Sequence, residues 1–328
     1  MKTHLSSFLF AIVIFFICIP CYSSNGFLWK VTGNGLKQES YILGTMHGDG
    51  LKHSLKDISL KSARIEDIVD EVDMVVTEVS DDFHDSAVVS DCRKALVMVM
   101  AYEGDDTASA MPLNNSYRDL YKDSKKYDRT DSYMIDTLHI EGYQSRKPMY
   151  WVLRIVGVQM AEDKSEGYTL DRCVTTIARE KSKSLCSLET YSQQAKYNIA
   201  RLKNCPYYGK TLEEQAEMLY QQITNGSVLK ATTKQYRDST AYHYNRNSIE
   251  GMMRQDSAYS AKMTPAERYM FEKMAESGME RNKNWMPRIK EYISDRRCLI
   301  AVGYKHLYGD EGLISLLKAE GYKLTPIQ

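Results

Sequence analysis

The sequence lacks an excess of charge of either sign, because its 43 basic residues balance 43 acidic residues over 328 positions. Proteins that bind nucleic acids gather Lys and Arg in a patch or stripe that faces the phosphate backbone. The basic residues of this chain are not gathered into such a stripe. We therefore expect no nucleic-acid partner.

Long apolar runs are missing beyond the first two dozen residues. A membrane-spanning helix needs about 18 or more consecutive apolar residues, and no segment after residue 24 has such a run. The run from Phe8 to Ile19 is shorter, follows Lys2 and precedes a small-residue stretch that ends in Ser24. This is the pattern of a secretory signal peptide. We predict that residues 1–24 are removed and that the mature protein has no integral membrane segment.

A secretory signal peptide implies export, so we expect a periplasmic or secreted location. A lipoprotein signal is the alternative, because Cys18 and Cys21 lie near the position of lipid attachment. Pro20 before Cys21, and bulky residues before Cys18, fit such a site poorly. The remaining residues 25–328 are enough for one large domain or two small ones.

Cysteine is sparse, and no spacing motif indicates how the cysteines pair. Removal of the signal leaves an odd number of thiols, at Cys92, Cys173, Cys186, Cys205 and Cys298. None has the Cys-x-x-Cys spacing of zinc-thiolate or redox sites. We expect neither kind of site and consider a Cys186–Cys205 disulfide as the candidate pairing.

Each end of the chain has the pattern of a strand–helix–strand unit. At the N-terminal end, residues 27–31 and 40–43 predict a hairpin around a Gly-Asn-Gly turn, residues 59–71 a helix, and Met74–Thr77 a strand that ends at Glu78. At the C-terminal end, the pattern predicts a strand over 297–302, a loop over 303–309, a helix capped by Asp310, and a last strand over 322–327.

The middle of the chain, about 86–295, has the composition of a helical region. Residues 171–181 predict a helix and Ser184–Leu188 a short strand that stops at Glu189. Thr211 and Glu214 form a capping box before an apolar stripe. The fold class expected is therefore α/β (α+β), with a central sheet built from both ends of the chain and a large helical middle region.

Two Gly-x-x-His motifs follow predicted strands far apart in the sequence: Gly44 with His47, and Gly303 with His306. Ligands of open α/β sheets bind outside the carboxyl ends of the strands. The two histidines, with Glu78 and Glu189 at further strand ends, are therefore expected to meet at one edge.

Two imidazoles with one or two carboxylates suit a divalent metal that keeps an open coordination position. Such an ion activates water for hydrolysis of an amide or ester, and a remaining carboxylate can act as general base. A single Gly-x-x-His is a weak signal, and Glu189 alone could cap a helix or pair with Arg172 or Lys196. A purely structural polar network is thus a further alternative.

Several stretches resemble the TraB/GumN/PrgY family, which is related to the TIKI metalloproteases: Tyr41–His47, Val75–Glu78, Ser187–Gln193, Arg281–Trp285 and Ala301–Gly312. They occur in the family's order from about residue 27 to 328, which favours a single TIKI-like domain over 25–328. The resemblance implies a metal-dependent peptidase centre, with manganese or cobalt favoured and zinc a further possibility. By this resemblance His47, Glu78 and His306 are metal or catalytic residues, and Arg281 and Asn282 lie near a substrate carbonyl or carboxylate.

The sequence thus favours a secreted or periplasmic metal-dependent hydrolase that acts on a peptide or protein substrate, with Glu189, Arg281 and Asn282 supporting the metal ligands. The alternative is a peptide-binding or signal-damping protein of the same fold without turnover. The pattern leaves open the substrate, the metal and the oligomeric state.

Overall fold

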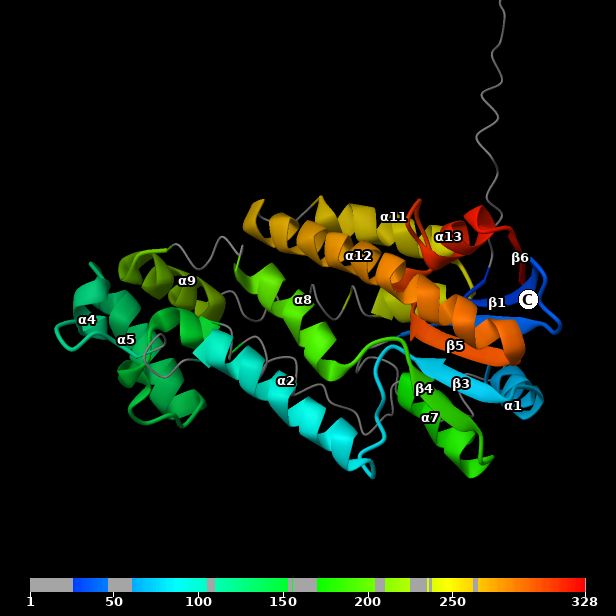
Figure 1. Cartoon of the computed structure of the whole chain (residues 1–328). Coiled ribbons are helices and arrows are strands. Elements are labelled where there is room, and N and C mark those ends of the chain that lie inside the picture. Colours follow the sequence, from blue (N-terminus) through cyan, green and yellow to red (C-terminus); the bar gives the residue numbers. More distant parts are fainter. Residues whose placement is uncertain are drawn as a thin grey trace, which may run out of the picture.

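The computed structural model of the chain describes residues 26–46, 61–104, 110–152, 155, 170–203, 210–224, 235, 238–261 and 265–327. Within these ranges six strands form one mixed sheet in the order β4-β3-β5-β2-β1-β6 (Figure 1). The strands are β1 (Leu28–Gly33), β2 (Ser40–Thr45), β3 (Met74–Thr77), β4 (Ser184–Ser187), β5 (Cys298–Gly303) and β6 (Tyr322–Pro326). The predicted fold class is confirmed, since the sheet draws its strands from both ends of the chain.

The centre of the sheet is parallel and one border is antiparallel. β2, β5, β3 and β4 run parallel to one another, whereas β1 pairs antiparallel with both β2 and β6. The predicted hairpin is the β1–β2 pair, and its turn carries positive φ at Gly33, Asn34 and Gly35. β5 therefore lies between two strands of the N-terminal unit, so neither end of the chain completes the sheet alone.

Helices cover both faces of the sheet. Alternate strand residues point to opposite sides, so Tyr41 and Leu43 join one buried cluster while Ile42 joins the other. The first cluster also contains side chains of α1 (Lys61–Glu71), α7 (Leu170–Glu180) and α11 (Ile249–Ser260). The second contains side chains of α12 (Pro265–Asp295) and α13 (Leu313–Ala319). Burial on both sides explains why the β5 sequence is continuously apolar.

The middle of the chain is helical, as predicted. Between residues 86 and 295, the described part contains β4 and one isolated bridge, from Ala110 to Arg146, as its extended pairings. Its other elements include α2 (Ser86–Gly104), α4 (Tyr117–Leu120), α5 (Ser124–Ser132), the π-helical turn η1 (Tyr133–Thr137), the 3-10 turn η2 (Tyr143–Ser145), α8 (Tyr191–Lys203) and α9 (Leu212–Thr224). Figure 1 shows α4, α5 and α9 gathered at the end of the molecule remote from the sheet. These helices share a third buried cluster.

The capping box at the start of α9 is confirmed. The Thr211 hydroxyl accepts from the Glu214 backbone N–H at 3.2 Å, and the Glu214 carboxylate accepts from the Thr211 N–H at 2.8 Å. The predicted stripe is buried at Ala216, Leu219 and Ile223. A local pattern thus defines both the beginning and the packed face of this helix.

The predicted N-cap at Asp310 is wrong. The helix begins at Leu313 and its N-cap is Gly312, which makes no side-chain capping bond. A Cβ atom on Gly312 would lie 2.5 Å from the carbonyl oxygen of Leu307. Between Asp310, the expected cap, and the helix, the chain still turns, with Gly309 at φ +91 just before Asp310.

The predicted Cys186–Cys205 disulfide is wrong as well, because Cys186 is a free thiol. Cys186 lies within β4, and α8 carries the chain away from the sheet before residue 205, which is outside the described residues. The predicted signal peptide, residues 1–24, is also outside them. Among the described helices, none is both long and apolar enough to span a bilayer.

Candidate functional site

Acidic side chains stand at the carboxyl ends of two neighbouring strands. Glu78 directly follows β3, and Glu189 lies just beyond β4. Backbone hydrogen bonds continue the pairing past the strands, because the Glu189 N–H donates to the Glu78 carbonyl at 2.9 Å. The two acids therefore lie side by side at one edge of the parallel sheet, where ligands of such sheets bind.

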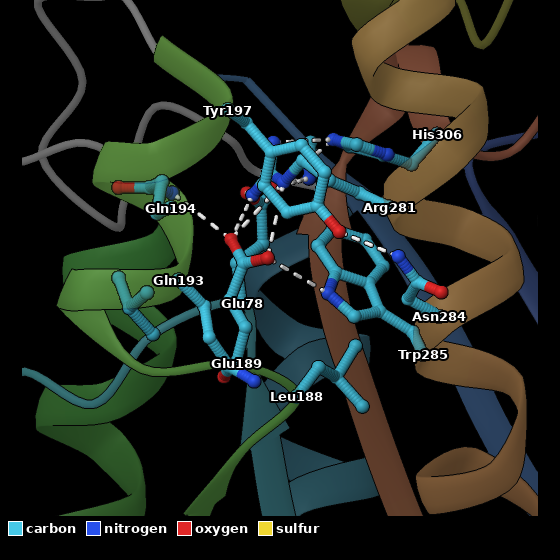
Figure 2. Close-up of polar contacts among 12 residues, drawn as sticks. Glu78, Leu188, Glu189, Gln193, Gln194, Tyr197, Arg281, Asn284, Trp285 and His306 are labelled. Carbon is cyan, nitrogen blue, oxygen red and sulfur yellow. Dashed lines mark hydrogen bonds and ion pairs between the residues drawn. The ribbon is translucent and has the colours of Figure 1, made fainter. Parts of the chain in front are cut away.

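A long helix brings the matching cation to this edge. α12 packs on the sheet through residues such as Ile289, and Arg281 lies two turns earlier, where the helix passes the strand ends. One guanidinium nitrogen of Arg281, Nη2, is 2.5 Å from Glu78 Oε2 and 2.5 Å from Glu189 Oε1 (Figure 2). The exposed fractions are 13% for the Arg281 side chain, 10% for Glu78 and 4% for Glu189. We call this ion-paired group, Glu78, Glu189 and Arg281, the acid–arginine triad.

The triad holds Arg281 firmly in its charged form. Burial opposes the positive charge, but hydrogen bonds to Glu189 and the negative charges of Glu78 and Glu189 outweigh burial and raise the pKa of Arg281 above its ordinary value. Two carboxylates against one guanidinium leave the triad with a net negative charge. Removal of one partner from a buried ion pair destabilises a protein by about 3–5 kcal/mol. Each of the three residues is therefore expected to depend on the others for its place in the folded structure.

His306 completes the cluster, and its orientation is fixed by Asn282. The Asn282 amide nitrogen donates to the carbonyl oxygens of His306 and Glu311, at 3.0 and 2.9 Å, so its side-chain oxygen must be the atom that faces the imidazole. This oxygen lies 2.7 Å from His306 Nδ1. In the neutral ring the hydrogen is therefore on Nδ1, and Nε2 is the acceptor.

The Nε2 atom of His306 faces the acid–arginine triad. It lies 3.2 Å from Arg281 Nη1, which donates to it, and 3.6 Å from Glu78 Oε1. The same Glu78 oxygen accepts the backbone N–H of Gly303 at 2.8 Å, which connects the end of β5 to the end of β3. Imidazole, carboxylate and guanidinium thus converge on one point at the sheet edge.

Trp285 forms the apolar wall of the cluster, a role that the sequence patterns did not indicate. Its indole N–H donates to Glu189 Oε2 at 3.1 Å, and its ring lies 4.7 Å from the Arg281 guanidinium carbon. The His306 and Trp285 ring centroids are 4.5 Å apart. At 1% exposure, Trp285 excludes water from one side of the charged groups.

An open pocket of about 440 Å³ adjoins the triad. It is lined by Thr77, Glu78, Val79, Asp171, Gln194, Asn198 and Arg281. Asp171 also escaped the sequence analysis, because an acid in the first turn of a helix is common for electrostatic reasons alone. Its Oδ1 accepts from the Thr45 hydroxyl at 2.5 Å, which ties α7 to the end of β2. Gln194 and Asn198, one turn apart on α8, supply amide groups to the same pocket.

Neither glycine of the two Gly-x-x-His motifs supplies a left-handed turn. Neither has a positive φ: Gly303 is at φ −51, and Gly44 is not among the positive-φ glycines of the described residues. Instead, a Cβ atom on Gly44 would lie 2.7 Å from Leu307 Cδ1 and 3.1 Å from the Tyr304 Cα. Gly44 is thus required because β2 and the turn η3 (Tyr304–His306) approach closely.

The predicted site residues are brought together as far as they are described. Glu78, Glu189, Arg281, Asn282 and His306 form one hydrogen-bonded cluster. His47 lies outside the described residues, but β2 and β5 are parallel neighbours that pair Thr45 with Gly303, so both motifs start at the same edge. The ion-pair partner of Glu189 is Arg281, which is neither of the two partners considered from the sequence.

The described donors fit a cation. Glu78 and His306 Nε2 are oxygen and nitrogen ligands of the kind that divalent metals take, and the guanidinium of Arg281 already stands in as a positive charge between them. Within the described residues, no group of three or more His, Cys, Asp or Glu side chains is arranged to hold a metal. The third predicted ligand, His47, is outside that search.

Comparison with known proteins places the whole of this architecture in one family. No curated protein and no solved structure gives a significant match. The model of the TraB/PrgY/gumN family matches residues 27–326, from the first strand of the sheet to the last. This match includes both Gly-x-x-His motifs, the two strand-end glutamates and Arg281, and the chain therefore belongs to the TraB/PrgY/gumN family.

Proposed function

We propose that the protein is an exported, periplasmic or secreted metal-dependent hydrolase, and that its substrate is a peptide or protein. The observation that carries the proposal is the arrangement of His306 and Glu78. Asn282 directs the Nε2 lone pair of His306 towards the strand-end acids, and Glu78 Oε1 lies 3.6 Å from that nitrogen. His47 would join them from the matching end of β2.

In this proposal the ligands are His306, Glu78 and His47, and the ion is manganese, cobalt or zinc. When bound, a divalent ion polarises a carbonyl group and makes water nucleophilic near neutral pH. The chain's own residues do the rest. Glu78 serves as a ligand or as the base that takes the proton of the attacking water, and Glu189 holds Arg281 and Trp285 in place.

The pocket beside the triad is the proposed position of the substrate. Gln194 and Asn198 line it with groups that both donate and accept hydrogen bonds, as a peptide backbone requires. Glu78 and Arg281 line it as well, so a bound amide would lie next to the proposed catalytic groups. This proximity supports an amide bond as the bond that is cut.

Peptide binding without cleavage is the second candidate, and one observation favours it. Arg281 pairs with both acids at 2.5 Å and donates to His306, so the groups that would hold a metal already have a cationic partner. The same cleft would then hold a peptide without turnover.

Metal analysis and peptide cleavage distinguish the two candidates. The mature protein is purified, its bound metals are measured, and it is incubated with a pooled peptide library with and without a chelator. We expect one of the three metals and chelator-sensitive cleavage. The variants E78Q and H306A are expected to abolish cleavage, whereas E311Q, which changes an exposed acid paired with Lys283, is expected to leave it intact.

Uptake of metal without cleavage would favour the binding candidate. Absence of both metal and cleavage, with the peptide pool instead retained by the protein, would lead to the same conclusion. Cleavage that resists the chelator and survives H306A would refute the proposed centre, because His306 and the ion are its essential parts.

A further inference from the structure

Arg281 contacts the same atoms that the proposed metal needs. Its Nη2 pairs with Glu78 Oε2 at 2.5 Å, and its Nη1 donates to His306 Nε2 at 3.2 Å. A lone pair that accepts an N–H hydrogen cannot simultaneously bind a metal ion. The guanidinium and a divalent cation are therefore alternatives at His306 and Glu78.

The second acid makes the arginine a stable occupant. Glu189 Oε1 accepts from Arg281 Nη2 at 2.5 Å and Glu189 Oε2 accepts from Arg281 Nε at 3.3 Å, which is the forked geometry that suits a guanidinium. Trp285 lies against the guanidinium and donates its N–H to Glu189. Glu189 and Trp285 thus favour the arginine-bound state without being predicted metal ligands.

We propose that Arg281 is an internal cation that competes with the divalent metal for Glu78 and His306, so that metal enters only when the guanidinium moves away. This proposal rests on the proposed metal-dependent function and concerns the regulation of the same site. Metal affinity is then set by the balance between two states of Arg281. If the open state is populated at about 0.1–10%, the apparent metal affinity falls by about 10–1000-fold.

A charge-matched variant tests the competition. R281M alone would remove the guanidinium that pairs with two buried carboxylates, so this single variant is expected to fold poorly. The double variant R281M/E189Q removes one charge of each sign, so the site keeps the net charge that the triad has now. The amide oxygen introduced by E189Q can still accept from Trp285, and Glu78 and His306 remain.

The measurement is a titration with MnCl2 alone, by calorimetry and by the electron paramagnetic resonance of free Mn2+, at one pH. We expect R281M/E189Q to bind Mn2+ at least about tenfold more tightly than the wild type. R288M is the matched control. Arg288 lies on the same helix and donates to the carbonyls of Ser187 and Leu188, so its loss is expected to leave Mn2+ affinity unchanged.

Each outcome decides the proposal. Equal Mn2+ affinity of the wild type and R281M/E189Q, whether tight or undetectable, overturns it. A wild type that binds Mn2+ tightly and cleaves peptides, with no gain in the double variant, overturns the competition but leaves the proposed function standing. Tighter binding by the double variant without chelator-sensitive cleavage by the wild type supports the competition and removes the hydrolase.

Discussion

The chemical state of His306 depends on one neighbour. The Asn282 amide nitrogen has two carbonyl acceptors, so its oxygen is left to receive the Nδ1 hydrogen of the imidazole. The other ring nitrogen then faces the acid–arginine triad as an acceptor. Outer-shell partners of this kind commonly fix the tautomer of a ligating histidine.

Replacement of Asn282 is expected to release this control. In N282A, Nδ1 loses its acceptor, and two carbonyl oxygens lose their donor, so we expect mixed tautomers and a loss of about 1–3 kcal/mol in the free energy of unfolding. In N282D the carboxylate still accepts from Nδ1, so the tautomer is expected to persist while stability falls. Imidazole 15N NMR reports the tautomer and urea denaturation the stability. A wild-type His306 protonated on Nε2 would contradict the assignment.

At the residue scale, sequence patterns predicted the two strand-end acids but not the arginine that pairs with them. Glu78 and Glu189 were recognisable because each follows an apolar strand, which is local information. The partner of Glu189 is Arg281, which is 92 residues away in the chain and lies on α12. Pairing with the nearer Arg172 or Lys196 was the available local expectation. Tertiary packing of α12 on the sheet decides the partner, and periodicity does not indicate that packing.

At the scale of elements, helix boundaries were predictable where capping is local. The box of Thr211 and Glu214 needs four consecutive residues and no tertiary contact, and it forms as predicted. Asp310 is an equally plausible cap by residue type, yet the helix begins at Leu313. A Cβ atom at the actual N-cap, Gly312, would collide with the backbone of Leu307 and Tyr308, so glycine is required there. Such crowding arises only after the loop has folded.

Removal of the cap at α9 gives a prediction for this element. T211A loses the hydroxyl that accepts the Glu214 N–H and is expected to destabilise the helix by about 1 kcal/mol. T211S keeps an equivalent hydroxyl and is expected to retain most of the stability. Urea denaturation followed by circular dichroism measures both. Equal stability of T211A and the wild type would show that the box contributes nothing beyond the packing of Ala216, Leu219 and Ile223.

At the scale of the whole molecule, the candidate site exists only when the two ends of the chain are assembled. β5 comes from the C-terminal unit but pairs with β2 and β3 of the N-terminal unit. Gly303 at its end donates to Glu78, which links the units within the site itself. The two matching motifs made this meeting predictable. The order of the strands was not predictable, because it depends on pairings across more than 200 residues.

The hydrophobic clusters predict two levels of stability within the molecule. All six residues of β5 are buried, because helices cover both faces of the sheet. The β5 backbone is hydrogen-bonded to a strand on each side. The remote helices α4, α5 and α9 share a separate cluster that contains no strand residue among those described. Regions with fewer connections to the main core open locally at lower free energy than global unfolding.

Native-state hydrogen exchange measured by mass spectrometry is therefore expected to give different opening free energies for peptides covering Cys298–Gly303 and Leu212–Thr224. The β5 amides should exchange only by global unfolding, and the α9 amides at a lower free energy that depends less on urea. T211A should lower protection further in α9 while β5 and the neighbouring Glu78 segment stay protected at low urea. Loss of protection in α9 and β5 together, at every urea concentration, would contradict this division, because it would mean that the remote helices and the sheet open as one unit. If the two parts open separately, the groups at the sheet edge keep their geometry while the remote helices open. Glu78 and Gly303, which are hydrogen-bonded to each other, then belong to the slowly exchanging part.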